Sequence, residues 1–144
     1  MLVSQILKSK PTAGVITIAP EATIAEAVAL LSGRKIGAVI VSGDGQRAQG
    51  ILSERDIVRA LGQSGAACLN DSVGSLMTSR LVSCQRGDEA QEVLQKMTDG
   101  RFRHMPVIEG GELVGLISIG DVVKARLEEL HAEKDALEGM IKGF

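Results

Sequence analysis

The chain has 144 residues, a formal net charge of −2 and a hydrophobic content of 44%, values typical of one folded globular unit. Its 16 basic and 18 acidic residues are nearly balanced and its aromatic content is 1%, which disfavours binding to nucleic acid or to an anionic membrane surface. No run approaches the ~18 apolar residues that a membrane-spanning helix needs, and the first residues do not resemble a targeting segment, so we expect a cytoplasmic protein.

The first half of the chain predicts the element order β-α-β-β-α. β-branched runs and turn residues mark the strands, and apolar residues at helical spacing mark the helices. In chain order the expected elements are a strand over residues 14–18, a helix over 23–31, strands over 36–41 and 48–52, and a helix over 56–61. Thr23 and Glu26 have the spacing of a capping box. Residues 62–72 lack an apolar period and are interpreted as a linker.

The second half repeats that order. Its expected elements are a strand over residues 81–84, a helix over 90–97, strands over 104–108 and 113–118, and a helix that begins at Asp121. The repeat is clearest where a glycine, two apolar residues, a serine, two variable residues and an aspartate recur at an offset of 65 residues, in Gly50 to Asp56 and Gly115 to Asp121. A lead-in segment also recurs, at Val3 and at Val73. The chain is therefore interpreted as a duplicated unit.

These elements predict an α+β fold, α/β-like in its alternation of helices and strands, in which two tandem β-α-β-β-α repeats pack with pseudo-two-fold symmetry. We assign residues 1–66 to the first repeat with its lead-in helix, residues 67–128 to the second repeat, and residues 129–144 to a helical extension. Neither half offers enough apolar surface for a secure core of its own. We therefore expect the halves to pack together and to form a cleft at their interface.

The last helix runs past its counterpart in the first repeat. Its apolar residues fall at alternating three- and four-residue steps, with Lys134 interrupting the series, and they are Val123, Leu127, Leu130, Leu137 and Ile141. This pattern is compatible with packing on the helix's own domain and equally with a contact to a second subunit, because two heptads are too few to establish a coiled coil.

The repeated serine and aspartate stand where a strand ends and a helix begins. The hydroxyl of Ser53, the carboxylate of Asp56 and the free N–H groups of the helix are expected at one edge of the sheet, and Ser118 and Asp121 repeat the arrangement. Helix N-termini and hydroxyls bind phosphate oxygens, and a carboxylate accepts hydrogen bonds from a pair of sugar hydroxyls. The pattern indicates a site for a phosphorylated ligand. The alternative is that both aspartates serve only as helix caps.

The element order, the Gly-h-h-Ser-x-x-Asp motif in both repeats, and the segment from Arg103 to Ile108 before a Gly-Gly turn resemble a tandem pair of cystathionine β-synthase (CBS) domains, also called a Bateman module. The resemblance covers about Val3 to Leu127. It implies a stand-alone regulatory module, commonly a homodimer, that binds an adenosyl ligand such as AMP, ATP, NAD(H) or S-adenosylmethionine between the repeats and modulates a partner protein. Residue types alone fix neither the partner nor the choice of ligand.

The resemblance also implies ligand-binding positions. For the first site they are Thr17, Ile18, Ile36, Gly37, Ala38, Ser53 and Asp56, and for the second Val82, Ser83, His104, Met105, Pro106, Ser118 and Asp121. In each site the aspartate is expected to hold the ribose and the nearby hydroxyl to help hold phosphate. Arg55, Arg103, Arg101 and Lys35 are candidates to neutralise phosphate, the alternative for each being a solvated surface charge. The repeats differ around these positions, so we expect one site to dominate.

Two other classes of function compete with ligand sensing. An enzyme is disfavoured because the chain has only two histidines, His104 and His131, and lacks a phosphate-binding Walker loop or a cluster with metal-ligand spacing. We therefore expect no catalytic residue and no metal. Cys68 and Cys84 lie outside any C-x-x-C spacing and are interpreted as reduced thiols. The second alternative is a ligand-independent interaction module whose terminal helix docks a partner.

Overall fold

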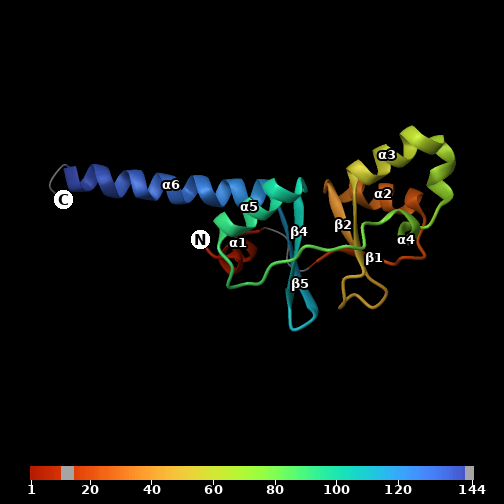
Figure 1. The fold of residues 1–144 in the computed structure, drawn as a ribbon, viewed down its shortest axis with the longest axis horizontal. Helices are drawn as coiled ribbons and strands as arrows, with labels where there is room; N and C mark the ends of the chain where they lie inside the picture. The colour runs from red at the N-terminus through yellow and green to blue at the C-terminus, as the bar shows by residue number, and fades with distance from the viewer. Residues whose placement is uncertain (11–14, 142–144) are drawn as a thin grey trace.

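The two repeats form two small sheets that lie side by side, each with its own helices (Figure 1). The computed structural model describes residues 1–10 and 15–141. In the first half the elements are β1 (Thr17–Ile18), α2 (Ile24–Arg34), β2 (Ala38–Val41), β3 (Gly50–Ser53) and α3 (Glu54–Ser64). In the second half they are α5 (Ala90–Gly100), β4 (His104–Glu109), β5 (Glu112–Ser118) and α6 (Ile119–Ile141). The predicted α+β fold is confirmed.

The first sheet has the strand order β1-β2-β3, with β1 parallel and β3 antiparallel to β2. All four residues of β2 are buried, as expected for a continuous apolar run in a central strand. Gly14, at the start of the expected first strand, lies outside the described residues. The Glu26 N–H donates to Thr23 Oγ1 at 3.1 Å at the start of α2. Of the two bonds of the expected capping box, this is the one that the described residues form.

The second sheet pairs β4 and β5 antiparallel, with a bulge between Val107 and Ile108. The strand predicted over residues 81–84 is wrong in extent, because Cys84 alone of these residues forms a bridge to β4. The Cys84 N–H donates to the Pro106 carbonyl at 3.0 Å, and the Ile108 N–H donates to the Cys84 carbonyl at 2.9 Å. The next bond of a parallel ladder would need an N–H on Pro106, which proline lacks. The pairing therefore stops after one residue.

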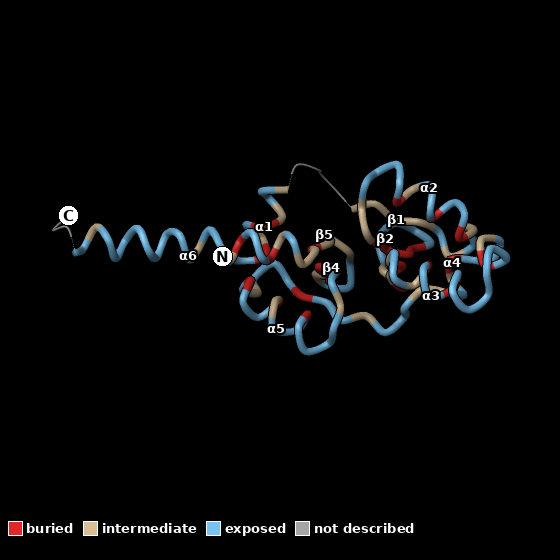
Figure 2. The backbone as a smooth tube through the Cα atoms, turned by 90° about the horizontal axis from the view of Figure 1, so that it is seen from above, coloured by how far each residue is buried: buried red, intermediate tan, exposed pale blue. Residues whose placement is uncertain are grey.

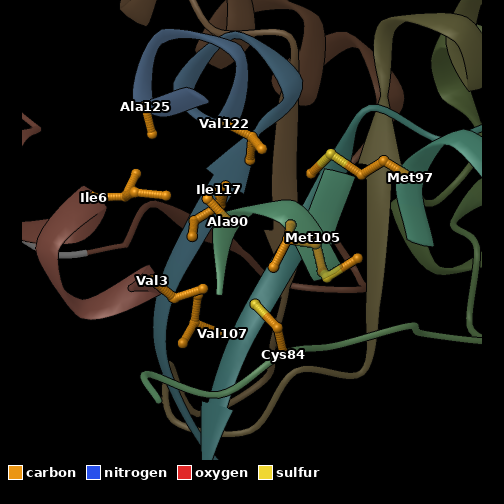
Figure 3. Packing of buried hydrophobic residues seen from close by; sticks show 11 residues of the cluster. Val3, Ile6, Cys84, Ala90, Met97, Met105, Val107, Ile117, Val122 and Ala125 are labelled. Carbon is orange, nitrogen blue, oxygen red and sulfur yellow. The ribbon is translucent and has the colours of Figure 1, made fainter. Parts of the chain in front are cut away.

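Two short lead-in helices cross between the halves. The N-terminal α1 (Val3–Ser9) packs against the core of the second repeat, in which Val3 and Ile6 are buried with residues of β4, β5 and α6 (Figure 3). The later α4 (Val73–Leu76) packs against the core of the first repeat, in which Val73 is buried. Helix α1 therefore precedes the first repeat in the sequence but completes the core of the second. Helix α4 follows the first repeat and completes the core of the first.

A glycine in each motif makes room for a lead-in segment. A Cβ atom on Gly50 would lie 2.5 Å from Met77 Sδ and 2.9 Å from the Thr78 carbonyl oxygen. A Cβ atom on Gly115 would lie 2.6 Å from Leu7 Cδ2. Since real Cβ contacts are not this short, the first residue of the repeated motif is a packing requirement. It allows α1 and α4 to approach the sheets.

The linker predicted over residues 62–72 is wrong in character, because most of it is helical. Helix α3 continues to Ser64 and is followed by the 3₁₀ helix η1 (Gly65–Asn70), which contacts α2 and α3. Cys68 of η1 is 1% exposed and anchors this segment. Small residues here replace an apolar period, so the helical signal in the sequence is weak. Cys68 and Cys84 are both buried free thiols.

Helix α6 extends away from the body of the molecule (Figures 1 and 2). Its first turns bury Val122 and Ala125 against the second core. Farther along, Leu130 is 49% exposed and Leu137 is 60% exposed, so the predicted apolar series is not covered by the chain itself. Among the described residues, no helix has both the length and the apolar character needed to cross a membrane.

Candidate functional site

Two clefts lie between the repeats, where Gly37 of the first repeat lies close to His104 of the second. Both residues line both clefts, and a Cβ atom on Gly37 would lie 3.4 Å from His104 Cε1. The first cleft has a volume of about 310 Å³ and the second about 580 Å³. The interface between the repeats therefore contains concave sites, as expected.

The motif serine caps a helix in both repeats, and the motif aspartate completes a capping box. The N–H groups of Ser53 and Ser118 each donate to Oδ2 of the following aspartate at 2.9 Å. The N–H of Asp56 donates back to the serine hydroxyl at 3.4 Å, and that of Asp121 at 3.1 Å. The helix predicted to start at Asp56 thus begins earlier, at Glu54. Oδ2 of each aspartate therefore acts in helix capping, as the alternative interpretation predicts. Oδ1 of each aspartate takes no part in the capping box.

The first cleft combines the motif of the first repeat with residues of the second. Ser53 and Asp56 line it together with Val82, His104 and Pro106. The sequence predicts a first site in which Ser53 and Asp56 join residues 17–18 and 36–38 of the same repeat. Of those positions Gly37 lines this cleft, whereas Ile36 and Ala38 line the second cleft, so the structure does not bring the predicted group together in one cleft.

The second cleft has the reciprocal composition. Ser118 of the second repeat lines it together with Ile36, Gly37 and Ala38 of the first. The predicted second site groups Ser118 with residues 82–83 and 104–106, and of these only His104 lines the same cleft. Each cleft therefore combines a motif serine of one repeat with residues of the other, but Asp56 lines the first cleft whereas Asp121 does not line the second.

Some predicted positions lie outside both clefts. Thr17 and Ile18 pair with β2, and Met105 is fully buried in the second core. Ser83 is exposed without lining either cleft. These positions are one or two residues from lining residues, and side chains that alternate between the faces of a strand explain why a neighbour lines the cleft instead.

The two aspartates have different surroundings. Lys10 Nζ donates to Asp121 Oδ2 at 2.9 Å and to the Leu116 carbonyl at 2.8 Å. Burial alone would raise the pKa of the Asp121 carboxyl, but the Ser118 N–H and the Lys10 ammonium hold that pKa below its usual value. Asp56 forms a longer ion pair with Arg59, whose Nη1 lies 3.9 Å from Oδ1 and whose side chain is 69% exposed. A ligand at the second motif would meet an aspartate that is already paired.

Arginines gather around the first cleft. Those that line it are all exposed, and they are Arg55, Arg59, Arg80, Arg101 and Arg103. Sequence reasoning missed Arg59 and Arg80, as well as Lys8 and Lys10 in the second cleft. Arg59 lies one helical turn after Asp56, which is a spacing that could have identified it. Lys10 is 111 residues from its partner Asp121, and no local pattern predicts that contact.

Two of the cleft cations stand in a restricted backbone conformation. Lys35 ends α2 with a φ of 54°, and Arg101 ends α5 with a φ of 57°. This left-handed region at a helix C-terminus is usually occupied by glycine. Lys35 lines the second cleft and Arg101 the first, at equivalent places in the two repeats.

The surroundings of His104 favour the neutral form of its imidazole. Burial lowers the pKa of its imidazole, and the nearby Lys10 ammonium lowers it further, against the opposing effect of Glu54. A neutral imidazole can donate one hydrogen bond and accept another, so His104 can meet a polar ligand group from either cleft. No group of three or more His, Cys, Asp or Glu side chains among the described residues could hold a metal ion.

Comparison with known proteins identifies the repeats. The family model described as "CBS domain" matches residues 3–63 and again residues 73–128. The CBS domain-containing protein CBSX3, mitochondrial, of Arabidopsis thaliana is 34% identical over 125 residues, and the match covers 84% of this chain and 61% of that protein. The chain thus spans less than two thirds of that relative's length.

Two solved structures extend the comparison. A CBS-domain containing protein from Agrobacterium tumefaciens is 45% identical with a TM-score of 0.83, and the match covers 88% of this chain and 99% of that one. A CBS domain protein from Pyrobaculum aerophilum, complexed with AMP, is 27% identical with a TM-score of 0.77, and the match covers 92% of this chain and 99% of that one.

Proposed function

The chain belongs to the CBS domain family as a tandem pair, and from this premise we propose that it is a regulatory module that binds an adenosyl nucleotide between its repeats. The ligand class comprises AMP, ATP, NAD(H) and S-adenosylmethionine. We further propose that the module is a cytoplasmic homodimer that modulates a partner protein rather than catalysing a reaction.

The observation that carries the proposal is the pairing of a helix N-terminus and a motif aspartate with the walls of the opposite repeat. In the first cleft, Ser53 and Asp56 supply a hydroxyl and a carboxylate, and Val82 and Pro106 of the second repeat supply apolar surface. Ligand sites typically combine apolar walls with a few polar groups that fix orientation. The AMP bound by the Pyrobaculum relative supports the ligand class.

Ligand binding can act on the arrangement of the repeats because each cleft contains residues of both. A ligand that prefers one arrangement shifts the population toward it, by an amount set by its difference in affinity between the two arrangements. The ligand-independent interaction module remains the alternative function. It is favoured by the exposed apolar residues of α6, and it predicts no effect of nucleotides on stability.

The test is a thermal-shift screen against AMP, ADP, ATP, NAD, NADH and S-adenosylmethionine. Ligand at about a hundred times its dissociation constant should stabilise the fold by about 2.7 kcal/mol. Asp56→Asn and Asp121→Asn form a matched pair, because asparagine keeps an acceptor oxygen for the serine N–H of the capping box while removing the charge. We expect Asp56→Asn to abolish the larger part of the shift. Flat curves for every ligand would support the interaction module instead.

A further inference from the structure

The first cleft carries more positive charge than an adenosine or a single phosphate needs. Its lining contains five arginines and two carboxylates, the latter from Glu54 and Asp56. From this arrangement we infer that the first cleft selects a nucleotide with two or more consecutive phosphates, such as ADP or ATP. The inference rests on the proposed function and narrows its ligand class.

The arginines come from three places in the fold. Arg55 and Arg59 belong to α3, Arg80 to the segment after α4, and Arg101 and Arg103 to the turn before β4. They therefore border the cleft from both repeats. A guanidinium binds phosphate oxygens in bidentate fashion, and charge-assisted bonds of this kind are stronger than neutral ones. A chain of phosphates offers more oxygens to cations on both sides of the cleft than a single phosphate does.

The aspartate and the arginines contact different parts of the ligand, the ribose and the phosphates. Asp56 Oδ1 has no hydrogen bond from the described residues and lies 3.9 Å from Arg59, so the carboxylate remains able to accept bonds from ribose hydroxyls. The arginines are left for the phosphates. The sulfonium cation of S-adenosylmethionine is repelled by the same charges, so this cleft disfavours that ligand.

The second cleft serves as an internal comparison. Its described lining contains Lys8, Lys10 and Lys35, and Lys10 is paired with Asp121. A lysine binds phosphate as a point charge and lacks the planar fork of arginine. A ribose at the second motif would also compete with the Lys10 ammonium for Asp121. The selection for several phosphates is therefore assigned to the first cleft.

The backbone at Arg101 allows a specific test. A residue with a Cβ atom in the left-handed region costs about 1–2 kcal/mol relative to the usual helical conformation, and glycine avoids this cost. Arg101 has this backbone conformation and carries a long cationic side chain that lines the first cleft. Strained positions of this kind often mark functional sites. They also offer a substitution that relieves strain while removing the charge.

The experiment is isothermal titration calorimetry of the full chain with adenosine, AMP, ADP, ATP, NAD, S-adenosylmethionine and inorganic tripolyphosphate. We expect ATP and ADP to bind at least about tenfold more tightly than AMP, with an affinity that falls as salt is raised. NAD also contains two consecutive phosphates, so the inference expects it to bind more tightly than AMP. Tripolyphosphate binding as tightly as ATP would overturn the inference, because the cleft would then be a general anion patch.

Arg101→Gly and Lys35→Gly are the matched variants, since each removes one cation from an equivalent left-handed position. We expect Arg101→Gly to weaken ATP binding about tenfold and AMP binding much less, while the melting temperature without ligand stays equal or rises. Lys35→Gly should leave ATP binding in the first cleft unchanged. Equal weakening by the two variants would contradict the assignment to the first cleft.

The two levels of proposal fail in different ways. If AMP or S-adenosylmethionine binds as tightly as ATP, the selection for several phosphates is wrong and the nucleotide-binding function stands. If no adenosine compound binds while the protein is folded, the proposed function itself is wrong.

Discussion

His104 lines both clefts, and its environment lowers the pKa of its imidazole below the ordinary value. Burial is the main cause of its lowered pKa, and the charged groups that act on it are Lys10, Glu54, Asp121 and Arg103. These groups come from both ends of the chain and from both repeats. The state of His104 is therefore sensitive to how the repeats are arranged.

This environment predicts a pH dependence of stability. The imidazole binds a proton more weakly in the folded than in the unfolded chain, whose ordinary value is 6.5. The stabilising contribution is therefore complete above that value and is lost as the pH falls below it toward the folded pKa. Urea unfolding between about pH 7.5 and about pH 5 should show falling stability, and His104→Gln should flatten this part of the profile. An unchanged slope in the variant would assign the effect to other groups.

Residue types predicted the chemistry of the site better than its assembly. Both Ser-x-x-Asp motifs lie at a helix start, as their spacing indicates, because capping is a local property of the chain. The grouping of residues into sites stays a prediction, and the clefts combine these residues differently because the grouping depends on which repeat faces which wall. The pairing of Lys10 with Asp121 was equally out of reach, since it joins segments that are distant in sequence.

At the scale of elements, the sequence predicted the order of helices and strands in both repeats and missed their ends. The strand near Cys84 is shortened by the missing N–H of Pro106, and the expected linker folds into η1 around Cys68. The spacing of apolar residues indicates which face of an element is buried. It carries little information about the hydrogen bonds that a neighbouring strand can form. The lead-in helices were recognised as equivalent, but their exchange between cores depends on tertiary packing.

The motif glycines give a prediction at this scale. Gly50→Ala brings a Cβ atom to 2.9 Å from the backbone carbonyl of Thr78, whereas Gly115→Ala meets only the flexible side chain of Leu7. We expect Gly50→Ala to cost about 1–3 kcal/mol in the free energy of unfolding and Gly115→Ala clearly less. Chemical denaturation of the two variants beside the wild type measures this difference. Equal losses would show that the Thr78 backbone yields as easily as a side chain.

The whole molecule consists of two cores with few connections between them. The Leu113 N–H donates to the Gln46 carbonyl at 2.7 Å, and Gly37 and His104 together line both clefts. Domain interfaces of limited size allow relative motion by default. A ligand that touches both repeats is therefore well placed to change the arrangement of the whole chain.

The exposed series on α6 leads to a prediction about assembly. Leu127 is 53% exposed, and Leu130 and Leu137 are similarly uncovered, so a second copy of the chain could bury them. The proposed homodimer predicts that Leu130→Ser with Leu137→Ser shifts the sedimentation coefficient toward the monomer and makes the melting temperature less dependent on concentration. Val58→Ser, at a 67% exposed position on α3, is the control for lost surface hydrophobicity. If the wild type already sediments as a monomer, the homodimer is wrong.

The exchange of lead-in helices also affects the order in which the chain can fold during synthesis. The first core draws its residues from one continuous stretch between Ile16 and Met77, and it can form as soon as that stretch has left the ribosome. The second core needs Val3 and Ile6 together with residues as late as Ala125. Closing so long a loop is slow. Helix α1 is thus made before the first core but is among the last of these elements to pack.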